Sequence, residues 1–314
     1  MKKDIKVLFS EFIKECRHAS RLSSETIRGY EHAFKLILSL YPDLDCDSVT
    51  PQVMTRFFEH LNTRQRLVGR GDIRTGVRKS TVATYRSKLY KFFEWLKRYG
   101  HIKENPFRLM EYPDVQYEDR KYLSKDDVEK IFTTVAFHMD WKNTLVKKRN
   151  ILIFQLLLSC GLRKGELLAL KLLDIDFERK ILTVQAETSK SKRKRLIPLN
   201  QKVLLDLKDY VEERKRRGKL TSYLLASANE DARLTAAGLK HLIEHVKKES
   251  GVKFHIHQMR HTFAVNLMYQ GTDMSKVKQL MGYKDIRMTA AYLRVLPPKA
   301  MQGDVEALTL ENLI

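Results

Sequence analysis

The chain has 314 residues, 43% hydrophobic and 31% charged, a composition that excludes a wholly disordered protein. Its formal net charge of +21 indicates a polyanionic partner or, as the competing interpretation, a generally basic soluble protein. Basic side chains outnumber acidic ones by 22 to 13 in residues 1–113 and by 37 to 25 in the remainder, so the excess is not confined to a basic tail. Both parts of the chain are therefore candidates for contact with that partner.

The three cysteines, Cys16, Cys46 and Cys160, form no CxxC pair, and the sequence predicts neither a disulfide framework nor a thiolate zinc site. The N-terminus lacks the apolar core of a signal peptide. The longest apolar run, residues 151–158, is too short to cross a membrane. We therefore expect a soluble protein of a reducing compartment, the cytoplasm, with no membrane partner.

Four helices are predicted in the first hundred residues. Apolar side chains recur at helical spacing in residues 5–16 and 27–38. Thr50 and Pro51 open a third helix, because threonine caps a helix and proline suits its first position. A fourth amphipathic pattern covers residues 80–99. Together they predict a small helical bundle.

The connection between the third and fourth helices is rich in arginine and glycine. This composition predicts a mobile basic loop. Two interpretations stay open, a solvated connection and a contact to phosphate groups. The arginines concerned are Arg64, Arg66, Arg70 and Arg74.

A change of pattern predicts a second domain. Residues 112–121 have no periodicity and are predicted to link an N-terminal domain, residues 1–111, to a second domain, residues 122–296. A capping box at residues 124–127 begins the second domain. A tail, residues 297–314, follows it and becomes apolar near its end.

The second domain is predicted to be α-rich with a short β interruption. Residues 181–185 and 195–199 are β-prone and flank a turn, which predicts a hairpin. The predicted fold class is therefore mainly α, with a four-helix bundle followed by an α-rich domain that contains a small β-hairpin or sheet.

The first candidate for chemistry is Arg163. It follows Gly161 at the start of a predicted helix, where an arginine beside backbone N–H donors can bind a phosphate. The competing interpretation is a surface arginine paired with Glu166 at i+3, which contributes little.

The second candidate lies in the predicted hairpin turn, where five of the six residues from Lys190 to Arg195 are basic. A lysine at a turn tip can reach into a groove and, among other cations, act as a proton donor. For most of the run, including Lys192, Arg193 and Lys194, we predict a solvated charge cluster or a general contact to phosphate.

The third candidate is the pair His257 and Arg260, which lie three residues apart on one face of a predicted helix. The competing interpretation is a metal site drawn from the nearby histidines, namely His241, His245, His255, His257 and His261. No HExxH motif is present and no nearby Cys or Asp completes a ligand set, so the metal site is disfavoured.

The fourth candidate is Tyr292, nine residues after Tyr283 and the preceding Gly282. Taken alone, each tyrosine is typical of a half-buried core residue. Their significance comes from their order after the other three candidates.

Together these residues resemble the tyrosine recombinase (phage integrase) family, including its Xer-type members. The matching positions, in chain order, are Gly161-Leu162-Arg163 with Glu166, Lys190 ahead of the strand at 196–199, His257-Gln258-Met259-Arg260-His261, and Tyr292. The resemblance covers residues 122–295 clearly and residues 1–113 more loosely.

The resemblance implies an enzyme that cuts and rejoins duplex DNA at specific sites through a 3′-phosphotyrosyl intermediate, with Tyr292 as the nucleophile. Arg163 and Arg260 would bind the two non-bridging oxygens, because their planar forks match a phosphate. Since the phosphotyrosine bond retains the energy of the broken one, neither ATP, a metal nor another cofactor is required.

The same resemblance assigns the remaining roles. Lys190 would protonate the 5′-oxygen, and His257 would help to deprotonate the tyrosine or hold the phosphate. Glu166 would orient the arginines. Tyr283 departs from the family pattern, which has His or Trp at this position; a tyrosine can donate a hydrogen bond to a phosphate but is a poor proton shuttle.

Recombination needs four active sites, so the resemblance also implies a homo-tetramer on DNA, of the kind that serves mobile elements. The tail, residues 297–314, either covers its own domain or docks on a neighbouring subunit, which the resemblance favours. Two other functions remain open, a relaxation of supercoils like that of type IB topoisomerases and a non-catalytic DNA-binding module.

Overall fold

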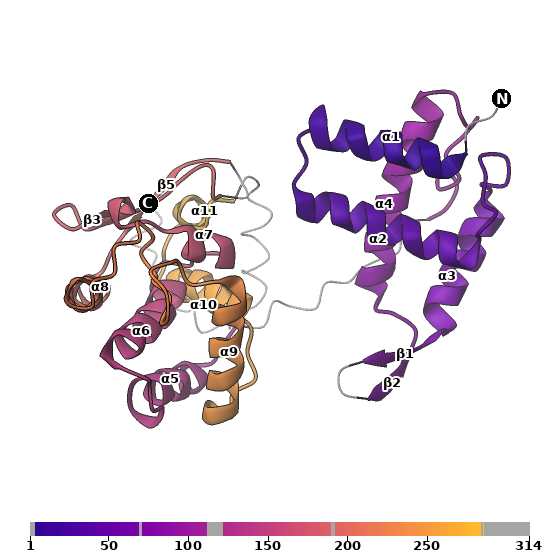
Figure 1. Ribbon diagram of the computed structural model, residues 1–314. Helices are drawn as coiled ribbons and strands as arrows, with labels where there is room; N and C mark the ends of the chain where they lie inside the picture. The colour runs from indigo at the N-terminus through magenta and orange to yellow at the C-terminus, as the bar shows by residue number, and fades with distance from the viewer. Residues whose placement is uncertain (1–3, 69–70, 112–121, 190–191, 284, 286–314) are drawn as a thin grey trace, which may run out of the picture. The chain divides into compact units, whose positions relative to one another are not determined.

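The structure is a computed structural model of the chain, and it describes residues 4–68, 71–111, 122–189, 192–283 and 285. The chain divides into two compact units, Met1–Tyr117 and Glu118–Ile314. Helices dominate both units (Figure 1). No helix in the described ranges is long and apolar enough to cross a membrane.

Within its described residues, the first unit has four α-helices and a two-stranded antiparallel hairpin (Figure 1). In chain order these are α1 (Ile5–His18), α2 (Ser24–Leu40), α3 (Pro51–Thr63), β1 (Gln65–Val68), β2 (Asp72–Thr75) and α4 (Lys79–Arg98). The four helices predicted from the apolar periodicity are confirmed.

The helices of the first unit begin at the predicted caps and share one core. The side chains of Ser23 and Thr50 accept hydrogen bonds from backbone N–H groups in the first turns of α2 and α3. In the core, the Phe9 ring stacks on Phe34 with 3.8 Å between centroids and meets Phe92 edge-on at 5.1 Å. The amphipathic stripes thus meet on one another, as their spacing predicts.

The prediction of a mobile loop between α3 and α4 is wrong, because the structure has the β1–β2 hairpin there. Its register runs from Gln65 opposite Thr75 to Val68 opposite Asp72. Gly71, in the connection, has a φ of +123° that favours glycine. Each strand has only four residues. An alternation of side chains this short is difficult to recognise in a sequence rich in arginine and glycine.

The second unit consists mainly of helices, with a small sheet at one edge (Figure 1). Its helical elements are α5 (Lys125–Thr133), the π-helix η1 (Thr134–His138), α6 (Thr144–Ser159), α7 (Lys164–Ala169), the 3-10 helix η2 (Leu172–Asp174), α8 (Gln201–Arg216), α9 (Ala236–Ser250), α10 (Ile256–Tyr269) and α11 (Met274–Met281). Ser124 caps α5 by accepting a hydrogen bond from the N–H of Asp127 at 3.0 Å, as predicted.

The predicted hairpin of the second unit is confirmed and belongs to a larger sheet. In the described residues, three antiparallel strands follow the order β3 (Ile175–Asp176), β4 (Ile181–Val184) and β5 (Arg195–Pro198). The register of β4 and β5 places Val184 opposite Arg195. Strand β3 has two residues, too few for an alternating pattern to reveal it in the sequence.

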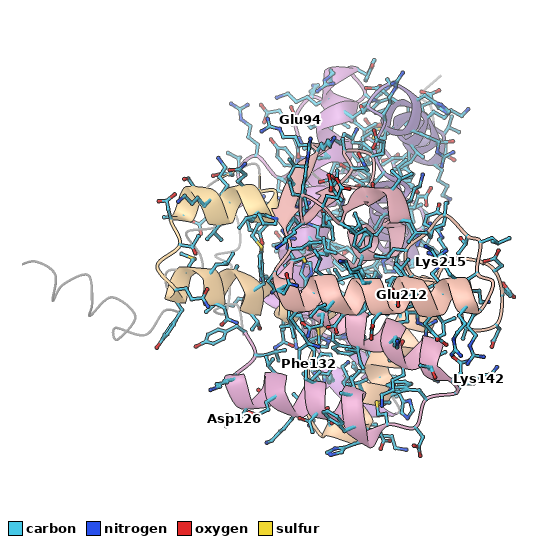
Figure 2. The ribbon with its side chains drawn as sticks, turned by 90° about the vertical axis from the view of Figure 1, so that its left-hand side faces the viewer. Glu94, Asp126, Phe132, Lys142, Glu212 and Lys215 are labelled. Carbon is cyan, nitrogen blue, oxygen red and sulfur yellow. The ribbon has the colours of Figure 1, made fainter. Side chains whose placement is uncertain are left out.

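Helix α6 passes through the centre of the second unit and packs against both α8 and α10. Figure 2 shows α8, which carries the labelled Glu212 and Lys215, in front of α6. Because protein covers α6 on several sides, its residues from Leu152 to Leu157 are almost all fully buried. The end of α6 is therefore a rigid support for the segment that follows it.

Candidate active site

The turn after α6 positions Arg163. Gly161, whose φ is +58°, follows α6, and Arg163 then becomes the N-cap residue of α7. A Cβ at position 161 would clash with the Phe263 ring, so both backbone conformation and space favour glycine there. The carbonyl of Gly161 accepts a hydrogen bond from Arg260, which links this turn to α10.

The side chain of Glu166, 1% exposed, lies at the centre of a cluster of arginines. Its Oε1 accepts hydrogen bonds from Arg163 Nη1 at 2.7 Å and from Arg195 Nη1 at 2.9 Å. Its Oε2 accepts from Arg195 Nη2 at 2.7 Å and from the backbone N–H of Arg163 at 2.9 Å. Arg260 Nη1 lies 3.9 Å from the same oxygen. One carboxylate therefore faces three guanidinium groups.

These neighbours keep Glu166 ionised although it is buried. Burial on its own raises the pKa of this carboxyl, because it penalises the charged form. The hydrogen bonds and charge of Arg195, together with the hydrogen bonds from Arg163, outweigh burial and lower the pKa to about 2. Glu166 is therefore an anion throughout the neutral range, and it balances part of the surrounding positive charge.

Arg260 projects from α10 and is almost completely buried, with 1% of its surface exposed. Its two terminal nitrogens donate to the backbone carbonyls of Gly161 and Met281. Burial lowers the pKa of its guanidinium, and the positive charges of Arg163 and Arg195 act in the same direction. An arginine stays protonated despite such a shift. The side chain is thus a fixed cation that joins the turn after α6 to the end of α11.

Arg195 completes the cluster and was not predicted from the sequence. It ends the basic run, most of which is predicted to be solvated, but it is only 6% exposed. Its Nε donates to the Leu280 carbonyl at 2.9 Å, while both terminal nitrogens bind Glu166. The available signal is the alternation of β5, in which Arg195 and Ile197 are buried and the residues after each are exposed.

Tyr283 follows the end of α11 and lies beside two of the arginines. Its ring centroid is 5.2 Å from Arg260 Cζ and 5.7 Å from Arg163 Cζ. The tyrosine is 9% exposed, and Gly282, with a φ of +61°, turns the chain toward it. The face of an aromatic ring attracts cations, so these contacts favour the observed packing. The residue that departs from the family pattern therefore lies next to both predicted phosphate-binding arginines.

His257 lies in the first turn of α10, three residues before Arg260, as predicted. Its side chain is exposed, and its ring centroid is 5.5 Å from that of His261. Among the residues that the structure describes, no group of three or more His, Cys, Asp or Glu side chains lies close enough to hold a metal ion.

Two predicted site residues, Lys190 and Tyr292, lie outside the described residues, as do Arg70 and residues 297–314. The described neighbours of Lys190 are informative. Lys192, Arg193 and Lys194 are exposed. A groove of about 570 Å³ begins at this basic turn, and its lining includes Arg193, Lys194, Arg195, Ser275, Lys278 and Tyr283. The basic turn and Tyr283 thus border the same groove.

Comparisons with known proteins identify the family. Residues 121–298 match the phage integrase family, and residues 9–100 match the phage integrase N-terminal SAM-like domain. The first match alone covers more than half of the chain. The protein therefore belongs to the phage integrase family, the tyrosine recombinases.

Curated relatives agree with this assignment. The chain is 28% identical to the tyrosine recombinase XerC of Thermodesulfovibrio yellowstonii, over 87% of this chain and 86% of the relative. It is 30% identical to XerC of Bacillus pumilus, over 70% of this chain and 72% of the relative.

Solved structures show the same fold. A structure of the Tn1549 transposon integrase in complex with transposon right end DNA has a TM-score of 0.73 at 20% identity, over 98% of this chain and 99% of that one. The XerH site-specific recombinase bound to its palindromic difH substrate has a TM-score of 0.72 at 16% identity, over 94% and 82% of the two chains.

Replacing Arg195 by methionine should destabilise the protein by about 3–5 kcal/mol, because it removes two of the hydrogen bonds to a buried carboxylate. Denaturant unfolding of the full chain, followed by circular dichroism, measures the loss. The matched control is Arg193→Met, an exposed arginine two residues earlier, with an expected change within about 0.5 kcal/mol. Equal effects of the two substitutions would contradict the buried role of Arg195.

The lowered pKa of Glu166 predicts a loss of stability in acid. Because the folded-state pKa of about 2 lies below the ordinary value of 4.5, the stabilisation is fully present above pH 4.5 and is lost as the pH falls toward 2. The difference corresponds to about 3 kcal/mol. Between pH 5 and 2, the unfolding free energy of Glu166→Gln should therefore fall by about 3 kcal/mol less than that of the wild type. Glu178→Gln, at an exposed position, should show the same pH dependence as the wild type. Parallel slopes for Glu166→Gln and the wild type would refute the assignment.

Proposed function

We propose that this chain is a site-specific recombinase that cleaves and rejoins duplex DNA through a 3′-phosphotyrosyl intermediate, with Tyr292 as its nucleophile. The observation that carries the proposal is the cluster in which Arg163 and Arg260 flank Tyr283 and face the buried Glu166. Membership of the tyrosine recombinase family supports the reaction class.

The arginine cluster suits a phosphate in both charge and shape. Arg163, Arg195 and Arg260 carry three positive charges, and Glu166 neutralises one of them. Arg195 uses both terminal nitrogens on Glu166, whereas Arg163 contributes one, and its side chain is 17% exposed. We assign the binding of the non-bridging oxygens to Arg163 and Arg260, whose planar forks match a phosphate in a way that lysine cannot copy.

The proposed cleavage step exchanges one phosphoester bond for another. The phenol oxygen of Tyr292 attacks the phosphorus, and the bond from phosphorus to the 5′-oxygen breaks. The phenol proton passes to a base, a role that we assign to His257, and Lys190 protonates the leaving 5′-oxygen. In rejoining, a 5′-hydroxyl attacks the phosphotyrosine and the proton transfers are reversed, so the reaction consumes no ATP.

Glu166 and Tyr283 have supporting roles in this proposal. Glu166 positions two arginines by direct hydrogen bonds and does no bond-making chemistry. We assign to the Tyr283 hydroxyl a hydrogen bond to the bound phosphate, because the Tyr283 ring lies 5.2 Å and 5.7 Å from the guanidinium carbons of Arg260 and Arg163. It would replace the His or Trp of the family pattern in that function.

Duplex DNA is the proposed partner, and the net charge of +21 supports it. We propose an N-terminal DNA-binding domain over residues 1–111, a linker over 112–121 and a catalytic domain over 122–296. Additional phosphate contacts are assigned to Arg64, Arg66, Arg70, Arg74, Lys192, Arg193 and Lys194. The similar solved structures of the Tn1549 transposon integrase and of XerH contain transposon right end DNA and a palindromic difH substrate, respectively.

Exchange between two duplexes requires four strand cleavages, and we therefore propose a homo-tetramer assembled on DNA. The tail, residues 297–314, would contribute by docking on a neighbouring subunit. Because the curated relatives are bacterial recombinases, we place the reaction in the cytoplasm. Relaxation like that of type IB topoisomerases is not favoured, since the relatives are named as recombinases.

Tyr292→Phe should bind DNA like the wild type and form no covalent adduct, because it lacks the attacking oxygen. The substrate is a nicked duplex that carries a site selected by the protein from random DNA, and adducts are detected by their slower migration in a denaturing gel. The matched control is Tyr269→Phe, at an exposed position on α10, which should form adducts at the wild-type rate. Adducts that persist in Tyr292→Phe would refute the proposed nucleophile.

Tyr283→Phe should lower the single-turnover cleavage rate by about 10²-fold, the usual effect of removing one donor to a developing negative charge. Tyr283→His restores a donor and should recover most of the rate. Both variants should bind the selected site with wild-type affinity, since the arginines remain. A wild-type rate in Tyr283→Phe would show that the hydroxyl does not act on the phosphate.

A further inference from the structure

The β1–β2 hairpin of the first unit is fixed at its base. The N–H of Gly76 donates to the Arg64 carbonyl at 2.9 Å, and Arg66 Nε donates to the Gly76 carbonyl at 2.7 Å. Gly76 has a φ of +71°, and a Cβ there would clash with the carbonyl of Asn62 at the end of α3. Figure 1 shows the hairpin extending beyond α3 and away from α1. The hairpin is therefore a projecting element with a defined attachment.

The register of the hairpin separates its side chains into two faces of different chemistry. Because side chains alternate along a strand, one face carries Gln65, Leu67, Ile73 and Thr75. We call this the uncharged face. The opposite face carries Arg66, Val68, Asp72 and Arg74. The uncharged face is the more accessible of the two, since all four of its residues are exposed.

An exposed apolar pair is the unusual feature of the uncharged face. Leu67 and Ile73 lie directly opposite one another, with 77% and 66% of their surfaces exposed. Burial of such side chains away from water is favourable. The position of two large aliphatic residues side by side on a projecting ribbon therefore indicates a surface that is covered when the protein binds its partner.

The positive charge of the hairpin favours duplex DNA as that partner. The hairpin and its ends carry four arginines and one acid among their described residues, namely Arg64, Arg66, Arg74, Arg78 and Asp72. A polyanion complements this surface. A second copy of a chain with a net charge of +21 would bring like charges together.

The residue types on the uncharged face match the base edges of DNA. The major groove is about 12 Å wide and admits a two-stranded β-ribbon. An amide such as that of Gln65 can pair with adenine, and the Thr75 hydroxyl can donate or accept. Aliphatic side chains such as Leu67 and Ile73 pack on the methyl group of thymine. Long arginines on the opposite face can extend sideways to the phosphates that border the groove.

We propose that the β1–β2 hairpin enters the major groove of the recombination site and reads thymine-containing base pairs with Leu67 and Ile73. Gln65 and Thr75 add hydrogen bonds to neighbouring base edges, while Arg66 and Arg74 contact phosphates. The inference rests on the proposed function only in taking duplex DNA as the partner, and it assigns part of the sequence specificity to an element outside the catalytic unit.

The test compares specific with non-specific binding by the full chain. The wild type selects a site from randomised duplex DNA, and affinities for that site and for a scrambled duplex are measured at several salt concentrations. The double variant Leu67→Ser/Ile73→Ser should lower the ratio of the two affinities by at least about 10-fold, the effect of one lost base contact. Its salt dependence should equal that of the wild type, since no phosphate contact changes.

Two control variants separate the roles of the faces. Arg74→Gln should weaken binding to both duplexes alike and reduce the slope of log affinity against log salt by about 1. Leu109→Ser, which removes an equally exposed aliphatic side chain elsewhere in the first unit, should change neither quantity. Thermal unfolding checks that the double variant folds, which is expected because both of its side chains are exposed.

Replacing thymine by deoxyuridine, one position at a time, removes single methyl groups from the selected site. At one or two positions the wild type should lose affinity while the double variant does not. An unchanged affinity ratio in the double variant would overturn the proposal. A defect confined to the assembly of several subunits would also overturn it, because the apolar pair would then contact a second copy of the chain. Failure of the wild type to select any duplex would overturn it as well.

The covalent-adduct assay, run in parallel on the wild type, decides the proposed function separately. If the wild type forms no adducts but the double variant has a reduced affinity ratio, the proposed recombinase activity is refuted and the hairpin inference stands. If the wild type forms adducts and the double variant has an unchanged affinity ratio, the proposed activity stands and the hairpin inference is refuted.

Discussion

The buried carboxylate of Glu166 is the interaction on which the candidate active site depends. Arg163 reaches it from α7 and Arg195 from β5, while Arg260 of α10 lies just beyond hydrogen-bond distance. Without this anion, three guanidinium groups would repel one another in a region of low solvent exposure. The carboxylate therefore makes it possible for elements distant in the sequence to present their positive charges at one place.

The same arrangement suits a reaction in which negative charge develops. Three cations and one anion leave the cluster with a net positive charge, which a phosphodiester would neutralise in the proposed reaction. The attraction would grow as the attacked phosphate gains negative charge, which is the condition for stabilising a transition state more than the ground state. Fixed partners such as the carbonyls that hold Arg260 limit reorganisation during the step. Stability and proposed catalysis thus draw on the same ion pairs.

The hairpin of the first unit illustrates a different relation between sequence and structure. Its arginines are visible as a basic stretch, yet their placement on one face and of Leu67 and Ile73 on the other requires the strand register. A loop would expose the same residues in no fixed relation to one another. If the uncharged face reads base edges as proposed, part of the sequence specificity depends on a pairing of only four residues per strand.

Apolar periodicity and the caps at Ser23 and Thr50 were enough to predict the helices of the first unit. The order of Arg163, Lys190, His257, Arg260 and Tyr292 was enough to predict the family. These features are local or depend only on spacing along the chain. The tertiary structure alone decided that Arg195 is buried against Glu166 and that residues 65–75 form a hairpin. Both depend on contacts between segments: a charged residue is buried only where another segment supplies its counter-ion, and a strand forms only where a second strand pairs with it.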